Sequence, residues 1–197
     1  MFTAAAILVG AFGTDALAAH QIAAQTVYVT FMIPSGIGHA AAYRVGHAIG
    51  AGDRDGARRA ARVALGLGAA VGMGTAVLLY ALAGPITGLF LDRSDPASRP
   101  IAELAISLLR IAAVFQMADG LQGIAGGALR GLKDARVPLL LALVTYGVCG
   151  LGAAWALGLS GSRGPAGVWW GLGIGLASTA VAFTWRFEKR VAALGQP

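Results

Sequence analysis

One acidic side chain lies inside an apolar stretch of the sequence that is long enough to cross a membrane. Asp119, with Gln116 and Gln122 on either side, belongs to the segment AVFQMADGLQG at 113–123. An ionised aspartate near the middle of a membrane helix costs about 2.5–3.5 kcal/mol, so such a residue usually has a partner or a function. A desolvated carboxylate can exchange a proton or a sodium ion. Asp119 is therefore our candidate for cation binding, and a hydrogen bond to a neighbouring helix is the structural alternative.

Asp119 shares one predicted helix face with Gln116 and with three glycines. The face has i, i+3, i+4, i+7 and i+11 spacing, which is one side of an α-helix, at positions 116, 119, 120, 123 and 127. We interpret the opposite side as lipid-facing; it carries Met117, Leu121, Ile124 and Ala128. This pattern predicts that Asp119 points toward other helices or toward a water-filled cavity.

A second stripe of mostly polar residues runs along the apolar segment at 22–43. Its members step by four and three residues alternately: Gln21, Gln25, Tyr28, Met32, Ser35 and His39. Pro34 is expected to bend or break this helix. We interpret Gln25, Tyr28, Met32, Ser35 and His39 as candidates to line a cavity together with Gln116; a hydrogen-bonded packing stripe is the alternative. His20 and His39 are interpreted as polar packing or cavity residues rather than as metal ligands.

The composition places these stripes in an all-helical membrane protein. Of the 197 residues, 57% are hydrophobic and 12% are charged, whereas a soluble domain has about 25% charged residues. The single cysteine, Cys149, excludes an internal disulfide. Apolar runs lie at about 1–12, 22–43, 63–91, 101–129, 138–159 and 165–185. The last five can each cross a bilayer, and we expect the first to be part of a helix, with a signal peptide as the alternative.

Basic residues concentrate in every second connection between the predicted spans. The alternation of 5, 2, 3, 1 and 3 basic residues, which counts Arg93 and Arg99 in the second connection, follows the positive-inside rule. It predicts a multi-pass protein of the inner (plasma) membrane with the 44–62 loop, the 130–136 loop and the C-terminus in the cytoplasm. The same distribution excludes nucleic-acid binding, which needs one continuous basic face.

Small residues recur at four-residue spacing in three of the spans. They are Gly68 and Gly72; Gly123, Gly127 and Gly131; and Gly167, Gly171 and Gly175. This spacing lets helices approach closely in lipid, so it predicts tight packing within the bundle, with homodimerisation as the alternative. Trp169 and Trp170 are expected at the outer membrane interface.

Two charged sites outside the stripes also carry expectations. Asp53 or Asp55 is expected to cap the helix that begins before Ala57. Arg110 lies inside a span, where it is expected either to extend toward the membrane surface or to pair with an acid on another helix.

Two long segments resemble the C-terminal half of NorM-like transporters of the MATE (multidrug and toxic compound extrusion) family. The first runs over 16–60 and contains Ala-Ala-His-Gln, Phe-Met-x-Pro and Arg-Val-Gly; the second is VFQMADGLQGIAGGALRGLKDARVP at 114–138. The resemblance extends in order along essentially the whole chain. It implies one six-helix lobe over 1–190, helices seven to twelve of twelve with the seventh truncated, and a cytoplasmic tail at 191–197.

The resemblance also implies a function. Members of the family export cationic or amphipathic compounds in exchange for H⁺ or Na⁺, and Asp119 stands where a carboxylate is proposed to bind the coupling cation. Some members have a tyrosine four residues earlier, where this chain has Phe115, which favours H⁺ over Na⁺. The implied partners are the lipid bilayer, a small cationic or amphipathic substrate and an N-terminal lobe supplied in cis or in trans.

Two other functions remain as alternatives. A non-transporting membrane fragment is one, and a lipid-linked oligosaccharide flippase of the same superfamily is another; the flippase would favour a strongly cationic cavity. An enzyme is not expected, because the spans contain no nucleophile–base pair and no set of metal ligands.

Overall fold

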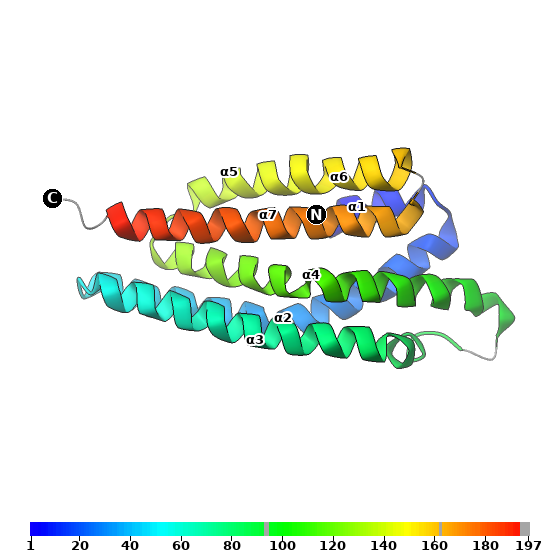
Figure 1. Ribbon diagram of the computed structural model, residues 1–197, viewed down its shortest axis with the longest axis horizontal. Helices are drawn as coiled ribbons and strands as arrows, with labels where there is room; N and C mark the ends of the chain where they lie inside the picture. Colours follow the sequence, from blue (N-terminus) through cyan, green and yellow to red (C-terminus); the bar gives the residue numbers. More distant parts are fainter. Residues whose placement is uncertain (93–94, 162, 194–197) are drawn as a thin grey trace.

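A computed structural model describes residues 1–92, 95–161 and 163–193 as an elongated helical bundle (Figure 1). The long helices are α2 (Thr14–Gly50), α3 (Arg54–Thr87), α4 (Arg99–Gly131) and α7 (Gly164–Ala193). A further helical segment combines α5 (Arg136–Val144), η2 (Thr145–Leu151), α6 (Gly152–Trp155) and η3 (Ala156–Ser160). The short elements are α1 (Phe2–Gly10) and η1 (Pro96–Ser98). Five of the described helical segments are long and apolar enough to span a membrane, which confirms the predicted fold class.

The helices extend beyond the apolar runs that predicted them. The basic segment expected as a loop at 44–62 is almost wholly helical, because α2 continues to Gly50 and α3 begins at Arg54. Arginine is a good helix former, and the Asp53 carboxylate accepts a 2.7 Å hydrogen bond from the backbone N–H of Gly56 at the start of α3. The predicted N-cap is therefore confirmed at Asp53.

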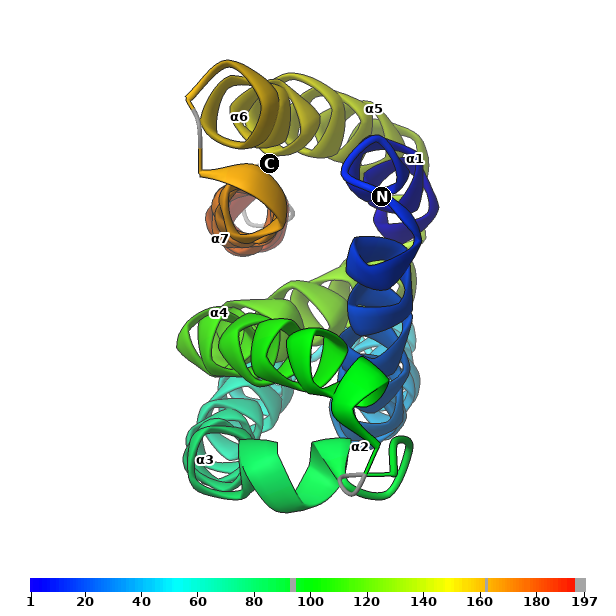
Figure 2. The same cartoon turned by 90° about the vertical axis from the view of Figure 1, so that its right-hand side faces the viewer.

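α4 occupies the centre of the bundle. It packs against α2, α3 and α7, while the α5–α6 segment covers the other side of α7 (Figure 2). The side of α4 that we expected to face lipid is therefore buried at one end: Ile124 and Ala128 are inaccessible, whereas Met117 is 39% exposed and Leu121 is partly exposed. The prediction was wrong for Ile124 and Ala128, because residues facing lipid and residues facing a neighbouring membrane helix are equally apolar.

Each of the three glycine motifs is buried against another helix of the same chain. Gly127 lies against the backbone of Gly38 in α2, Gly171 against Ala154 in α6, and Gly68 against the Ile124 side chain. The prediction of tight bundle packing is confirmed. Because these faces are occupied within one chain, the alternative of homodimerisation through them is wrong.

Pro34 bears on the expected shape of α2. The helix passes through Pro34 without a break, so of the two expected outcomes, a bend or a break, the break is wrong. The proline ring is buried against Gly120 of α4, where an added Cβ would lie 3.3 Å from Pro34 Cβ. Contact with α4 thus holds the proline inside a continuous helix.

Trp169 is completely buried. The prediction that it anchors at the membrane interface is therefore wrong. Its indole N–H donates a 3.1 Å hydrogen bond to Nδ1 of His20, and its ring lies near those of Phe2 and Phe115. His20 is thereby a packing residue, as expected. This aromatic cluster joins α1, α2, α4 and α7 at one end of the bundle.

The three strongly basic connections lie together at the opposite end (Figure 1). The Asp134 carboxylate, in the turn after α4, accepts a 2.8 Å charge-assisted hydrogen bond from Arg186 and lies 3.5 Å from Arg190. Glu188 of α7 pairs with Arg58 at 3.1 Å and with Arg62 at 3.3 Å. These ion pairs tie α3 and the α4–α5 turn to α7.

The remaining predictions concern Arg110, Arg93 and the C-terminal tail. Arg110 extends over the ring of Tyr80, with 5.6 Å between the guanidinium carbon and the ring centroid. α7 continues to Ala193, into the expected tail. Arg93 and residues 194–197 lie outside the described residues.

Candidate functional site

Asp119 lines an open cavity of about 370 Å³ whose wall is formed by several elements of the bundle. Its side chain is 4% exposed, and the prediction that it points inward agrees with this position. α2 contributes the largest share of the wall, and α1, α4, η2 and α7 contribute the rest. The residues that line the cavity are Met1, Phe2, Gln21, Ala24, Gln25, Val27, Tyr28, Phe31, Asp119, Gln122, Tyr146 and Leu176.

A short chain of hydrogen bonds reaches Asp119 from the opposite wall of the cavity. The hydroxyl of Tyr146 donates a 2.7 Å hydrogen bond to Oε1 of Gln122. The amide Nε2 of Gln122 then lies 3.5 Å from Oδ1 of Asp119, at the long limit of a hydrogen bond. Because Tyr146 occupies the carbonyl end of the amide, the amide presents its NH₂ group to the carboxylate.

Tyr146 is a site residue that the sequence analysis missed. It lies in the π-helical segment η2, and the adjacent Thr145 hydroxyl is 2.7 Å from the Thr179 hydroxyl of α7. π-Helical segments inside α-helices occur frequently at functional sites. Two polar residues in the apolar run at 138–159 were a signal for this position, but the run alone does not show which helix they face.

The predicted stripe on α2 divides into two parts. Gln25 and Tyr28 line the cavity together with Asp119. Met32, Ser35 and His39 do not line it, because Phe31 is the last α2 residue in the wall and an added Cβ on Gly123 would lie 2.9 Å from its ring.

Gln116 is buried beside the cavity but is not part of its wall. Its amide nitrogen donates a 2.9 Å hydrogen bond to Oγ1 of Thr30. Its Oε1 atom is buried and has no hydrogen-bond partner among the residues that the structure describes. Gln116 therefore links α4 to α2 one turn before Asp119.

The wall of the cavity presents oxygen atoms that can coordinate a cation, and it contains no Lys or Arg side chain. The carboxylate of Asp119, the amides of Gln21 and Gln25 and the hydroxyl of Tyr28 lie in its wall, and none of its lining residues is Lys or Arg. Oxygen ligands suit a proton or a hard cation such as Na⁺. A flippase with a strongly cationic cavity is not favoured by this lining. Among the described residues, no three His, Cys, Asp or Glu side chains are grouped to hold a metal ion.

The bundle, with its buried acidic site, is that of an integral membrane protein, and the comparisons with known proteins identify the family. The MatE family profile matches residues 1–156. The chain belongs to the MatE family of multidrug efflux transporters.

Two relatives and one solved structure show how much of such a transporter the chain covers. It is 49% identical to a probable multidrug resistance protein NorM of Pseudomonas aeruginosa, over 98% of this chain and 40% of the relative. It is 47% identical to the multidrug resistance protein NorM of Burkholderia vietnamiensis, over 98% of this chain and 42% of the relative. A MOP superfamily transporter structure from Pyrococcus furiosus has the same fold, with a TM-score of 0.89 at 20% identity, over 100% of this chain and 42% of that one. The chain thus spans about two fifths of its relatives and corresponds to their C-terminal part.

Proposed function

We propose that this chain forms the C-terminal lobe of an antiporter that exports cationic or amphipathic compounds in exchange for H⁺ or Na⁺. Asp119 is the residue that binds the coupling cation. The observation that carries the proposal is a buried carboxylate that opens onto a cavity and, among the residues that the structure describes, forms no ion pair. A buried acid in a membrane helix is costly unless its charge is compensated, and a coupling cation provides that compensation.

The cavity also suits a cationic amphipathic substrate. Phe2, Tyr28, Phe31 and Tyr146 supply aromatic surface beside the carboxylate. Aromatic faces attract cations, and the attraction increases when water is excluded. A substrate and the coupling cation would then compete for the same negative charge, which links export of one to entry of the other.

The arrangement of charge supports one orientation of the lobe in the membrane. The basic connections are gathered at one end of the bundle, and the positive-inside rule favours that end, with the C-terminus, on the cytoplasmic side of the inner (plasma) membrane. Alternating access requires a second bundle that moves against the first around the central site. The proposed transporter therefore includes an N-terminal lobe, in cis or in trans, as well as the surrounding bilayer.

Dye export tests this function. Residues 1–197 are joined behind the N-terminal part of the P. aeruginosa relative, and ethidium efflux is measured in cells that lack other exporters. We expect efflux above background that Asp119→Asn abolishes. Glu103→Gln is the matched control and should retain efflux, because Glu103 is an exposed acid at the start of the same helix and lies 3.8 Å from Arg99. Wild-type efflux by Asp119→Asn, at equal amounts in the membrane, would exclude the coupling role.

A further inference from the structure

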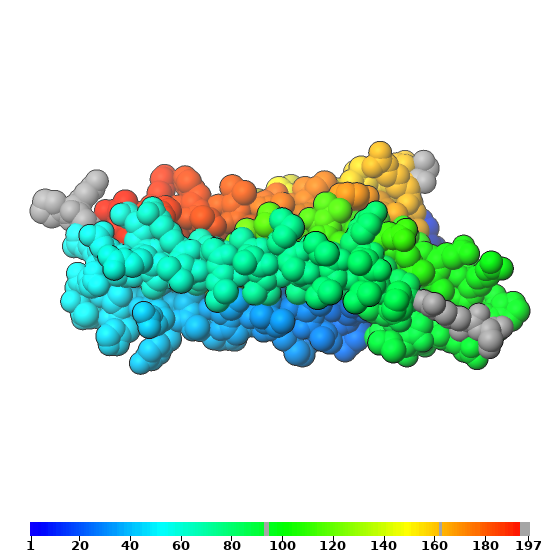
Figure 3. All heavy atoms as spheres, turned by 60° about the horizontal axis from the view of Figure 1, so that its bottom comes forward, coloured from blue at the N-terminus to red at the C-terminus, as the bar shows by residue number. Residues whose placement is uncertain are grey.

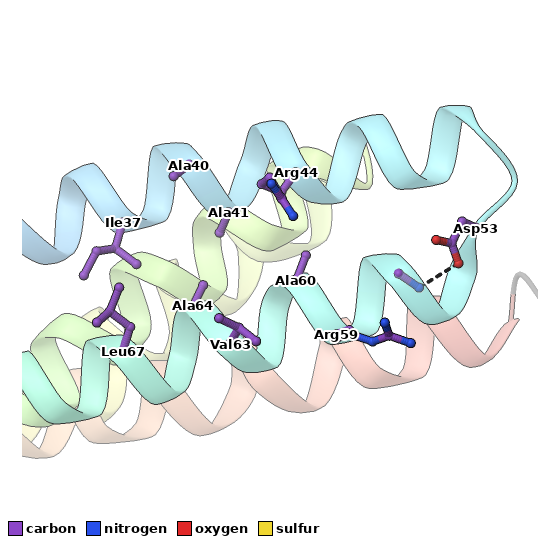
Figure 4. A pocket seen from close by; sticks show the side chains of 11 residues that line it. Ile37, Ala40, Ala41, Arg44, Asp53, Arg59, Ala60, Val63, Ala64 and Leu67 are labelled. Atoms are coloured by element: carbon purple, nitrogen blue, oxygen red, sulfur yellow. Dashed lines mark hydrogen bonds between the residues drawn. The ribbon is translucent and has the colours of Figure 1, made fainter.

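A groove between α2 and α3 lies outside the Asp119 cavity and has no role in the proposed transport cycle. Figure 3 shows the face on which these two helices lie side by side. Small residues open the groove, because Ala40 and Ala41 of α2 face Ala60 and Ala64 of α3 (Figure 4). The resulting hollow has a volume of about 460 Å³.

The groove changes character along its length. Ile37, Val63 and Leu67 line the part nearer the middle of the bundle, whereas Arg44 and Arg59 lie toward the turn between the helices (Figure 4). Apolar chemistry toward the membrane interior and cationic chemistry toward the membrane surface match the two parts of a phospholipid.

A second hollow continues the polar end of the groove. It also measures about 460 Å³, shares Arg44, Asp53, Gly56 and Ala60 with the first hollow, and adds residues that include Tyr43 and His47. The two hollows together provide room for a headgroup beside the turn and an acyl chain between the helices.

The charge at this end favours an anionic occupant. Neither Arg44 nor Arg59 forms an ion pair within the described part of the chain, whereas the nearby Arg58 and Arg62 are both paired with Glu188. The Asp53 carboxylate accepts the N–H of Gly56 as the helix cap. The groove thus holds two guanidinium groups for one carboxylate that is already engaged. Guanidinium groups bind phosphate oxygens in a bidentate manner.

We propose that the α2–α3 groove is a binding site for an anionic phospholipid, with its phosphate at Arg44 and Arg59 and one acyl chain between Ile37 and Leu67. Lipid chains in the groove restore the dispersion contacts that an empty slot in the hydrocarbon would lose. The basic residues select an acidic headgroup in the leaflet at this end of the bundle, where basic segments attract anionic lipids.

Native mass spectrometry of the purified chain in detergent tests the proposal with added phosphatidylglycerol or with phosphatidylcholine of the same acyl chains. We expect phosphatidylglycerol to be retained preferentially. Arg44→Gln/Arg59→Gln should weaken that retention about 30-fold, as estimated for two basic residues at an anionic lipid surface. The charge-matched control is Arg54→Gln/Arg136→Gln. It removes two exposed arginines that lie at the same end of the bundle but do not line the groove, so this variant should retain phosphatidylglycerol as the wild type does.

A second variant tests the apolar part. Ala40→Trp adds an indole from the exposed edge of the groove and keeps both arginines, so it should also reduce phosphatidylglycerol retention. The soluble headgroup glycerophosphoglycerol should not displace the lipid, because it lacks the acyl chain. Equal retention of the two lipids, equal losses in the two double variants, displacement by the soluble headgroup, or a dimer that fills the groove without lipid would each overturn the proposal.

Discussion

The contact between Gly127 and Gly38 leads to a quantitative prediction about the centre of the bundle. A Cβ added at Gly127 would lie 2.7 Å from the carbonyl carbon of Gly38 and 2.9 Å from its Cα, and closer still to its carbonyl oxygen. These are backbone atoms, so no side-chain rotation can relieve the overlap. α2 and α4 would have to separate by several tenths of an ångström in Gly127→Ala.

Gly74→Ala provides a matched control for this change. Gly74 lies in the interior of α3, and an added Cβ there would meet nothing within 4 Å. Replacing glycine by alanine in a helix interior gains up to about 1 kcal/mol from helix propensity in both variants. The difference between them therefore isolates the cost of overpacking, which is typically about 1–3 kcal/mol.

Unfolding in mixed micelles, followed by the fluorescence of the chain's tryptophans, measures both variants. We expect Gly127→Ala to be less stable than Gly74→Ala by about 1–3 kcal/mol. Equal stability of the two variants would refute the close approach of α2 and α4 at this position, and with it the central place of α4.

Two further stability measurements address polar contacts at the two ends of the bundle. Asp134→Asn should cost about 1–3 kcal/mol, because it weakens two ion pairs at a carboxylate that is only 7% exposed. Glu188→Gln should cost about 0–1 kcal/mol, because the Glu188 side chain is 39% exposed and water screens its pairs. Similar losses of unfolding free energy in the two variants would contradict this difference in burial. Trp169→Phe should cost about 1–3 kcal/mol of unfolding free energy, mainly because Nδ1 of the buried His20 loses its hydrogen-bond donor. A double-mutant cycle with His20→Ala that shows no coupling energy between the two residues would contradict this hydrogen bond.

The sequence predicted the spans and the direction of Asp119 because both depend on regularities along a single helix. Charge alternation marks the ends of the spans, and 3.6-residue periodicity places Asp119 on the same face as the glycines that contact α2. The family resemblance added the identity of the lobe: the family profile confirmed the family, and the matches to the relatives confirmed the C-terminal half.

The sequence did not predict which helix each face contacts. In the bilayer, apolar residues cover both the lipid-facing and the helix-facing sides, so Ile124 and Ala128 gave no sign that α4 is enclosed on several sides. Likewise, Trp169 satisfies its N–H with His20, 149 residues away in the chain, so its burial could not be distinguished from anchoring at the interface. Tyr146 reaches the Asp119 cavity only because of how the α5–α6 segment packs on α7.

Cation binding by the purified chain tests the central claim most directly. Radioactive sodium binding and proton uptake are measured in lipid nanodiscs for the wild type, Asp119→Asn and the control Glu103→Gln. The account predicts that the wild type and Glu103→Gln bind a proton or a sodium ion that Asp119→Asn does not bind. Identical uptake of both cations by the wild type and Asp119→Asn would contradict the assignment of Asp119 as the coupling residue.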